Sequence, residues 1–344
     1  MKLKAGIINI TGYAGSELAR LLYHHPHVDL VSVTGRSEKG KNLTDVFPHL
    51  TINDLTIDAE LSSVDIAFSA LPHKASAEAL IPLIGKNMKI IDISADFRLK
   101  NADQYIAWYD FVHPAPDKLL EAVYGIPEFY RQQIKQAKLV ANPGCYPTAA
   151  LLALAPLVKN RLIYPDIIVD SKSGVSGAGR TLSLGSQYCE ATDNVSAYAL
   201  GGHRHLPEIV QELKNLYAEF KPSVSFVPHL VPMSRGILCT CYTRLKENKF
   251  ALGKEQDEIM NIFQAFYAAE PFIKVVKQPP GTKHAWGSNL CLIYPSFDIR
   301  TNRVIVISCI DNLVKGAAGQ AIQNMNIMYG FPETAGLDLV PVYP

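Results

Sequence analysis

The sequence has almost no excess charge of either sign and no long run of apolar residues. Its 344 residues include 33 Lys or Arg and 32 Asp or Glu, so the net charge is +1, and the charges are spread along the chain. This balance argues against a nucleic-acid partner or a membrane-surface role, because both depend on concentrated positive charge. Apolar residues make up 48% of the chain, yet no stretch is long enough to span a membrane, and no signal-peptide pattern opens the sequence. We therefore expect a soluble, cytoplasmic protein without a membrane partner.

Cysteine is also scarce, and its spacing argues against a disulfide-stabilised fold. Scattered thiols in a long chain are typical of reduced proteins. Cys239 and Cys241 form the one close pair in a strand-like pattern, and no second pair at metal-ligand spacing accompanies it. We expect free thiols, no metal site and a core position for this pair. The six cysteines are Cys145, Cys189, Cys239, Cys241, Cys291 and Cys309.

The first 145 residues show a regular alternation of strand and helix patterns. The strand patterns are apolar without clean alternation, and amphipathic helix patterns separate them. This combination indicates a parallel sheet covered on both faces, so the sequence predicts a doubly wound α/β domain. The predicted strands are 5–10, 28–35, 64–71, 88–94 and 139–141, and the predicted helices are 15–25 and 74–84.

The second part of the chain is dominated by strand patterns. Runs of strands with few helices indicate an α+β domain with a mostly antiparallel sheet. A last helix pattern, 315–330, could pack back on the first domain. The predicted strands are 166–174, 224–232, 236–245, 289–297 and 303–311, and the helices between them are 206–220 and 254–269.

One cysteine stands at a junction of strand and helix patterns. Cys145 lies in "NPGCYPTA", between the apolar run 139–141 and a long apolar helix pattern that has Pro147 near its start. The N–H groups and the dipole of a first helical turn favour negative charge, so a thiol there should ionise more readily than a free one. Cys145 is a candidate nucleophile on these grounds, and a buried structural cysteine is the alternative.

The segment "NITGYAG" follows the first predicted strand and opens the first helix. A dinucleotide pyrophosphate binds at such a turn in α/β folds. Gly12 and Gly15 occupy the second and third glycine positions of the motif, and Asn9 replaces the first. Asn tolerates a positive φ better than most residues, so the turn can still form. Because such turns also occur without ligands, the next strand is needed to support the assignment.

The end of the second predicted strand supplies basic residues where an NAD site usually has an acidic one. "GRSEKGK" contains Arg36, Ser37, Lys39 and Lys41. Guanidinium and ammonium groups suit the 2′-phosphate of NADP. We infer NADP(H) as the cofactor, in preference to NAD and to a solvated basic loop.

Two later stretches could act on a substrate. "GGHRHLPEIV" places His203 and His205 before a helix, whose amino terminus favours the neutral imidazole that a general base requires. "SGVSGAGR" is a Gly and Ser rich loop that ends in Arg180, and its N–H groups and guanidinium could hold an oxyanion. Arg235 in "PMSRG" is a second candidate for binding a carboxylate or phosphate. Surface histidines and an ordinary flexible loop are the alternatives.

Together these stretches resemble one known family along almost the whole chain. "TGYAGSEL", "NPGCYPTA", "SGVSGAGR", "GHRHLPEI" and "DNLVKGAAGQAIQNMN" are similar to segments of the N-acetyl-gamma-glutamyl-phosphate reductases, NADPH-dependent enzymes of arginine biosynthesis. The resemblance implies an α/β fold, with a Rossmann-type doubly wound parallel sheet in residues 1–144 that the C-terminal helix in 312–344 completes. It also implies an α+β, glyceraldehyde-phosphate-dehydrogenase-like catalytic and dimerisation domain in residues 145–311, and a homodimer or homotetramer.

The resemblance further implies roles for residues that match the family's motifs. Cys145 matches the nucleophile, and His203 and His205 match the segment that provides the acid and base group, with the choice between them open. Asn9 departs from the usual glycine, so its effect on pyrophosphate geometry is open as well. The implied cofactor contacts are Thr11, Gly12, Tyr13, Ala14, Gly15, Arg36, Ser37, Ala70, Pro72 and Asn312. The candidate substrate contacts are Ser173, Gly174, Arg180 and Arg235.

These assignments describe a thioester mechanism for an acyl phosphate substrate. The thiolate of Cys145 displaces phosphate, hydride from NADPH reduces the thioester, and a histidine supplies the proton. The main alternative is the carrier-protein-linked aminoadipyl-phosphate reductase of lysine biosynthesis, whose substrate differs by one methylene and a blocking group. A non-catalytic NADP-binding regulator with the same fold would leave the thiol and the histidines without a use.

Overall fold

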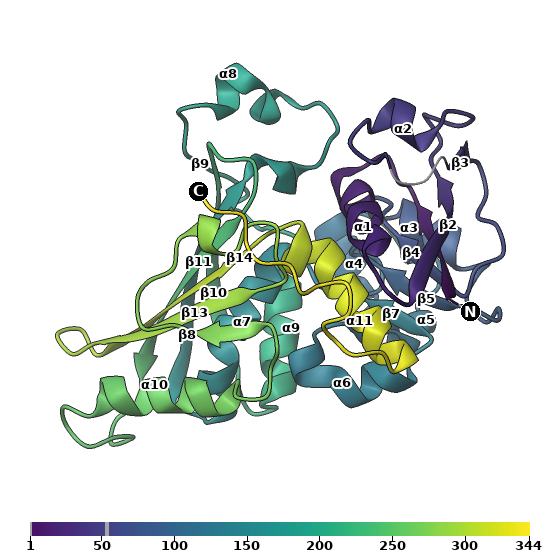
Figure 1. Cartoon of the computed structure of the whole chain (residues 1–344). Helices are drawn as coiled ribbons and strands as arrows, with labels where there is room; N and C mark the ends of the chain where they lie inside the picture. The colour runs from purple at the N-terminus through teal and green to yellow at the C-terminus, as the bar shows by residue number, and fades with distance from the viewer. Residues whose placement is uncertain (1, 52–54) are drawn as a thin grey trace. The chain divides into compact units, whose positions relative to one another are not determined.

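The chain forms two compact units in the computed structural model, which describes residues 2–51 and 55–344 (Figure 1). It passes from the first unit to the second between Gly144 and Cys145. The candidate nucleophile is therefore the first residue of the second unit. The first unit consists of Met1–Gly144, Gly179–Thr181 and Ala317–Leu339, and the second of Cys145–Ala178, Leu182–Gly316 and Val340–Pro344.

In the first unit, seven strands among the described residues form one sheet in which every pair of neighbours is parallel. Their order is β3-β2-β1-β4-β5-β7-β6. The chain changes direction across the sheet between β1 and β4, the place where α/β sheets bind ligands at the carboxyl ends of their strands. The predicted doubly wound parallel sheet is confirmed. The strands are β1 Leu3–Ile8, β2 Val28–Thr34, β3 Ile57–Asp58, β4 Ile66–Ser69, β5 Lys89–Asp92, β6 Val123–Tyr124 and β7 Leu139–Ala141.

Amphipathic helices cover this sheet. α1 buries Leu18, Leu21 and Leu22 on one side, as its apolar spacing requires. α1 contacts α11, and α11 contacts α6, so these three helices form one layer. The helices of the first unit are α1 Tyr13–Tyr23, α2 Leu43–Val46, α3 Ala75–Leu80, α4 Asp103–Tyr109, α5 Lys118–Glu121, α6 Pro127–Gln136 and α11 Gly319–Tyr329.

The second unit is built on a mixed, mostly antiparallel sheet of order β12-β13-β14-β11-β8-β10-β9. β8 pairs with β10, and β12 with β13, in parallel; the remaining neighbours are antiparallel. The predicted α+β character of this part of the chain is confirmed. The strands are β8 Ile163–Gly174, β9 Ser196–Ala197, β10 Ser223–Val231, β11 Ile237–Leu245, β12 Ile273–Val275, β13 Cys291–Asp298 and β14 Arg303–Ile310.

One helix lies at the centre of the second unit. Every residue of α7 from Tyr146 to Val158 is buried, and the helix contacts α9, α10 and four strands of the sheet. A helix that is apolar all round is fixed by core packing on all sides. The position of its first residue, Cys145, is therefore set by the core. The helices are α7 Cys145–Lys159, α8 Tyr188–Ala191, α9 Leu206–Leu216 and α10 Glu255–Phe266, with 3-10 turns at Val175–Ala178, Leu184–Ser186 and Thr282–His284 and a π-helical turn at Val314–Ala318.

None of the six cysteines, all of which lie in the described ranges, forms a disulfide. Cys239 and Cys241 are fully buried on one face of β11, with their sulfur atoms 3.7 Å apart, so the predicted core position is confirmed. No helix in the described ranges combines the length and apolar character needed to cross a membrane. Across the same ranges, no group of three or more His, Cys, Asp or Glu is arranged to hold a metal ion.

Candidate active site

Cys145 lies at the amino terminus of α7, and three residues separate it from the end of β7. The strand and the helix occur where the sequence predicts them. The first turn of α7 contains no acidic residue, so the positive end of the helix dipole is not neutralised within the helix. The side chain of Cys145 is partly accessible, whereas Gly144 and Tyr146 on either side are buried. Cys145 is thus a partly accessible cysteine at a helix end that favours negative charge.

The C-terminal part of the second unit returns to the nucleophile at a glycine. A Cβ atom at Gly316, in the π-helical turn, would lie 2.8 Å from Cβ of Cys145 and 3.3 Å from its Cα. Real Cβ atoms do not approach so closely, so any other residue at position 316 would displace Cys145 or the turn. π-helical turns are frequent at functional sites. Gly316 was not predicted as a site residue, because no local pattern in the sequence indicates that it meets a residue 171 positions away.

Three aromatic rings surround His203. Its ring centroid lies 5.8 Å from that of Tyr146, 5.5 Å from Tyr198 and 5.2 Å from Phe226, with the rings edge to face. Since Tyr146 directly follows Cys145 in α7, this cluster brings the predicted histidine segment to the start of that helix. The structure thus places the thiol and the histidine predicted from separate motifs in one region of the second unit.

The two tyrosines of this cluster were not predicted as site residues. The hydroxyl of Tyr198 donates to that of Tyr146 over 3.2 Å. Burial raises the pKa of Tyr198 to about 12, and the charge of Cys145 adds to the shift. Burial also raises the pKa of Tyr146, again with a contribution from Cys145. Both hydroxyls therefore stay protonated within electrostatic range of the thiol. Their proximity in sequence to Cys145 and His203 was the available signal.

His203 is neutral at physiological pH. Burial and, second, the charge of Arg204 together lower its pKa to about 4. The backbone N–H of His205 donates to Nδ1 of His203 over 3.1 Å, which assigns the ring proton to Nε2. His203 therefore offers one N–H donor. His205 is the N-cap residue of α9, with its ring centroid 4.8 Å from that of His203.

Two segments that contain predicted substrate residues pair with each other: the end of β8 with the turn after it, and the loop before β11. The backbone N–H of Gly174 donates to the carbonyl of Gly236 over 2.9 Å, and a Cβ at Gly174 would lie 2.8 Å from the backbone N of Arg235. Asn312 joins both segments, because its side chain accepts from the N–H of Gly236 at 2.7 Å and donates to the hydroxyl of Ser176 at 2.9 Å. Ser173, Gly174, Arg235 and Asn312 are therefore neighbours in the second unit.

Arg235 also carries an ion pair. Its guanidinium lies 3.6 Å from a carboxylate oxygen of Asp311, which is fully buried. Asp311 in turn accepts backbone N–H groups from Leu313 at 2.8 Å and from Gly287 at 2.8 Å. The side chain of Arg235 is about one-third exposed, and Asp311 fixes the direction of its guanidinium.

Arg180 does not join this group. Its contacts assign it to the first unit, where Nη1 donates to the carbonyl of Thr11 over 3.0 Å. Its guanidinium also lies 4.7 Å from the ring centroid of Phe47. Arg180 was predicted to act with Ser173 because both lie in the stretch "SGVSGAGR", whereas the structure places Arg180 beside the glycine turn.

That glycine turn joins β1 to α1 and begins at Asn9. Asn9 has a φ of +67°, so it adopts the conformation that a glycine usually provides. Its side chain donates to the carbonyl of Ala70 at 2.9 Å and accepts from the hydroxyl of Thr11 at 3.0 Å. Asn9 therefore forms the turn and also ties it to the segment after β4, through the carbonyl of Ala70.

Gly12 and Gly15 serve this turn in different ways. A Cβ at Gly15 would lie 2.6 Å from the carbonyl oxygen of Asn9, so α1 could not pack on the turn with any other residue there. At Gly12, the N-cap residue, no described atom lies within 4 Å of the position that a Cβ would take. Tyr13 and Ala14 complete the start of α1. The open backbone and the helix dipole fit an anionic group such as a pyrophosphate.

A cavity of about 330 Å³ lies at the carboxyl ends of β1, β2 and β4. Arg36 and Ser37, after β2, line one side, and Pro72, after β4, lines another. Its lining residues include one cation, Arg36, and no carboxylate. This cavity fits a nucleotide portion that carries additional negative charge, and it contains three of the predicted cofactor contacts.

Family models match both parts of the chain. Residues 4–137 match "Semialdehyde dehydrogenase, NAD binding domain", and residues 145–312 match "Semialdehyde dehydrogenase, dimerisation domain". The first unit is therefore an NAD(P)-binding domain. Among solved structures, aspartate semialdehyde dehydrogenase II from Vibrio cholerae is similar, with a TM-score of 0.72, 17% identity and coverage of 96% of this chain and 99% of that one. Aspartate semialdehyde dehydrogenase with NADP from Candida albicans has a TM-score of 0.70, 16% identity and the same coverage. These likenesses confirm the fold.

Sequence relatives are much more similar. The chain is 56% identical over 344 residues to the N-acetyl-gamma-glutamyl-phosphate reductase of Dehalococcoides mccartyi, a match that covers 100% of this chain and 99% of the relative. It is 47% identical over 351 residues to the enzyme of the same name from Desulforamulus reducens, with 99% and 100% covered. The protein is an oxidoreductase of the N-acetyl-gamma-glutamyl-phosphate reductase family.

Proposed function

We propose that this protein reduces N-acetyl-gamma-glutamyl phosphate to N-acetyl-glutamate semialdehyde, with release of phosphate, in arginine biosynthesis. The observation that carries the proposal is the position of Cys145. It is a partly accessible thiol at the amino terminus of a buried helix, in a chain that matches reductases of this name over its full length.

Cys145 is the nucleophile in this proposal. Its thiolate attacks the acyl carbon of the substrate, the bond to phosphate breaks, and a thioester forms. The dipole of α7 stabilises the thiolate before attack. The same helix end stabilises the oxyanion that forms as the carbonyl is attacked, because its N–H groups point toward developing negative charge. Restoring the thiolate releases the aldehyde.

We assign the proton-handling role to His203 in preference to His205. The ring of His203 is enclosed by Tyr146 and Tyr198 near the start of α7, and its neutral form carries the proton on Nε2. A neutral imidazole donates a hydrogen bond to an oxyanion without adding a full charge. His205 instead occupies the N-cap position of α9.

NADPH is the cofactor that fits the first unit. The open backbone at Gly12 fits the pyrophosphate, and Arg36 with Lys39 provides cations for a 2′-phosphate where an acidic residue would disfavour one. When bound, NADPH supplies the hydride that reduces the thioester. We propose that Thr11, Ser37, Ala70 and Pro72 also contact the cofactor. Arg180, which donates to the carbonyl of Thr11, is then a contact of the cofactor and not of the substrate.

The remaining predicted residues act on the substrate or position it. Arg235 and Ser173, in the two paired segments, are candidates for binding the substrate's carboxylate or phosphate. Asn312 holds those two segments together, which makes it a positioning residue for them. This division places cofactor binding in residues 1–144 with the C-terminal helix, and catalysis in residues 145–311.

We also propose a homo-oligomer, a dimer or a tetramer, that acts in the cytoplasm. Supporting this, the second unit matches a family model named for dimerisation. The carrier-linked aminoadipyl substrate remains the alternative within the same chemistry. Full-length matches to acetylglutamyl enzymes at 46–56% identity favour the acetylglutamyl substrate.

The reverse reaction tests the proposal. Purified protein is mixed with N-acetyl-glutamate semialdehyde, phosphate and NADP+, and NADPH formation is followed by absorbance, beside a Cys145→Ser variant. We expect a phosphate-dependent signal that the variant loses. A folded, NADP-binding protein that gives no signal would overturn the substrate assignment. Near-full activity of Cys145→Ser would overturn the thioester mechanism.

A further inference from the structure

One wall of the cofactor cavity is a short segment with an unfavourable backbone conformation. Leu71, Pro72 and Ala75 line the cavity, and α3 begins at Ala75. Lys74, the N-cap residue of α3, has a φ of +70°, and within the described chain its side chain forms no capping hydrogen bond. A positive φ is costly for a residue other than glycine and persists only where the surroundings enforce it. Another part of the chain must therefore hold this segment.

Asp96 holds it with both carboxylate oxygens. Oδ1 accepts the backbone N–H of Lys74, and Oδ2 accepts that of Ala77, each over 2.8 Å. The carboxylate thereby supplies partners for N–H groups that the helix itself cannot pair, and it lies at the end of α3 where negative charge is favoured. Asp96 is fully buried, so water does not compete for these two bonds.

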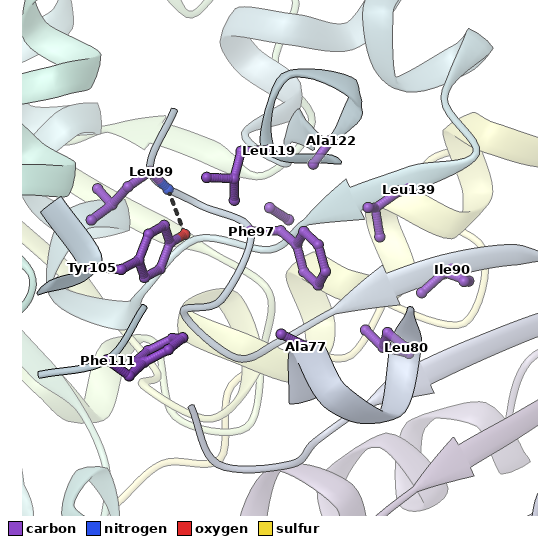
Figure 2. Close-up of a cluster of buried hydrophobic side chains, with 11 residues drawn as sticks. Ala77, Leu80, Ile90, Phe97, Leu99, Tyr105, Phe111, Leu119, Ala122 and Leu139 are labelled. Carbon is purple, nitrogen blue, oxygen red and sulfur yellow. Dashed lines mark hydrogen bonds between the residues drawn. The ribbon is translucent and has the colours of Figure 1, made fainter. Parts of the chain in front are cut away.

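The segment that carries Asp96 is fixed in the core. Phe97 and Leu99, which follow it, belong to the same buried apolar cluster as Ala77 and Leu80 of α3, as Figure 2 shows. The hydroxyl of Tyr105 accepts the backbone N–H of Leu99 at 3.1 Å, the dashed line in Figure 2. Asp96 therefore links the cavity wall to a rigid part of the first unit.

We infer that Asp96 is a positioning residue for the cofactor: it fixes the backbone at Lys74 and so keeps Pro72 and Ala75 in place as the cavity wall. This inference rests on the proposed assignment of the cavity to NADPH. Asp96 does not line the cavity itself. Loss of its two hydrogen bonds should weaken cofactor binding and leave the thiol of Cys145 unaffected, because Cys145 belongs to the second unit.

Two matched substitutions distinguish this positioning role from the effect of replacing any buried carboxylate. Asp96→Asn replaces one acceptor oxygen with an NH2 group, which would face a backbone N–H that cannot turn away. Asp92→Asn is the control. Asp92 is also fully buried, but it accepts the hydroxyls of Ser76 and Ser94, each over 2.7 Å, and hydroxyls can rotate to accept instead. Its one backbone donor, the N–H of Ser94 at 3.0 Å, can still reach the amide oxygen.

The experiment titrates the full-length protein with NADPH, followed by cofactor fluorescence, and measures alkylation of Cys145 by iodoacetamide and the thermal midpoint. We expect Asp96→Asn to weaken NADPH binding about ten-fold, with Asp92→Asn within about two-fold of the unsubstituted protein. The alkylation rate should stay unchanged in both. If Asp96→Asn does not fold, Asp96→Ser gives the same comparison, because a serine hydroxyl can rotate its proton away from a backbone N–H.

Equal NADPH affinity in the unsubstituted protein and in a folded Asp96 variant would overturn the inference. A parallel loss of alkylation rate would also overturn it, because it would show general damage to the fold. Failure of the unsubstituted protein to bind NADPH at all would instead overturn the proposed function, and the inference with it. The first titration distinguishes these cases before any variant is compared.

Discussion

Gly316 approaches Cys145 so closely that its hydrogen cannot be exchanged for a methyl group without movement of one of them. A methyl carbon there would lie 2.8 Å from Cβ of Cys145. We predict that Gly316→Ala lowers kcat/KM by roughly ten-fold or more, since small displacements of a reacting atom are costly, and lowers stability by about 1–3 kcal/mol through overpacking. Steady-state kinetics and denaturant unfolding measure the two effects.

Gly185→Ala is the matched control for that substitution. Gly185 lies in an exposed turn of the same unit, where no described atom would meet the added methyl within 4 Å. It should leave both quantities near their original values. Unchanged kcat/KM in Gly316→Ala would show that the turn and Cys145 can separate without consequence for the thiol.

The ionisation of His203 depends on burial first and on a neighbouring charge second. Burial and Arg204 hold its pKa at about 4, so we predict no step from His203 in kcat/KM between about pH 5.5 and 8. Arg204→Ala should raise the pKa of His203 only part of the way to its ordinary value, because burial remains. An NMR titration of the ring Cε1–H measures the midpoint. A midpoint near 6.5 in the unsubstituted protein would contradict the buried, neutral state.

The lowered pKa of His203 also determines how its contribution to protein stability changes with pH. Between about pH 4 and 6.5 the folded protein binds fewer protons at His203 than the unfolded chain does. Its contribution to stability is therefore complete above pH 6.5 and is lost as the pH falls toward 4.

Asp92, at the carboxyl end of β5, gives the opposite dependence of protein stability on pH. Burial, and next the carboxylate of Asp96, raises the pKa of Asp92 to about 6. The folded protein therefore binds more protons there than the unfolded chain between about pH 4 and 6, and stability falls as the pH rises through that window. We predict that Asp92→Asn stabilises the protein by up to about 3 kcal/mol at pH 8 and by almost nothing at pH 4. Urea unfolding at both pH values measures this, and an equal gain at each would show that ionisation is not the cause.

Long, regularly patterned elements could be predicted from the sequence. The patterns at 206–220 and 254–269 correspond to α9 Leu206–Leu216 and α10 Glu255–Phe266, because three or more turns give a clear apolar stripe. The pattern at 315–330 divides into a π-helical turn and α11, since Gly316 must meet Cys145. Elements of two to four residues, such as β3, β9 and α8, are too short to show any periodicity, and the tertiary structure alone fixes them.

The residues of the candidate site also differ in whether a local pattern in the sequence indicates them. Local motifs indicated Cys145 and His203, because each lies at or just before the start of a helix, and a window of about ten residues is enough to recognise such a start. Asn312, Gly316 and Asp96 act through contacts with residues distant in sequence, so their structural roles could not be read from it. Arg180 is the opposite case. Its position in the sequence suggested a role beside Ser173, but in the structure it donates to the carbonyl of Thr11.

At the scale of the whole molecule, the boundary at Gly144 and Cys145 separates two functions that can be measured independently. Arg36 lines a cavity made entirely by the first unit, whereas Cys145 is positioned by α7 and Gly316 in the second. We predict that Arg36→Ala weakens NADPH binding about ten-fold or more, leaves NADH binding nearly unchanged and does not alter alkylation of Cys145.

Cys145→Ser is the reciprocal variant, in the second unit. Cys145→Ser should bind NADPH with unchanged affinity although it has lost turnover, because Cys145 is not among the described residues that line the cavity. Fluorescence titrations with both cofactors and a timed alkylation assay on both variants provide all the comparisons. If Arg36→Ala weakened NADPH and NADH binding equally, the cation would serve the shared part of the cofactor, and the preference for NADPH would have to come from Lys39 or Lys41 in the same loop.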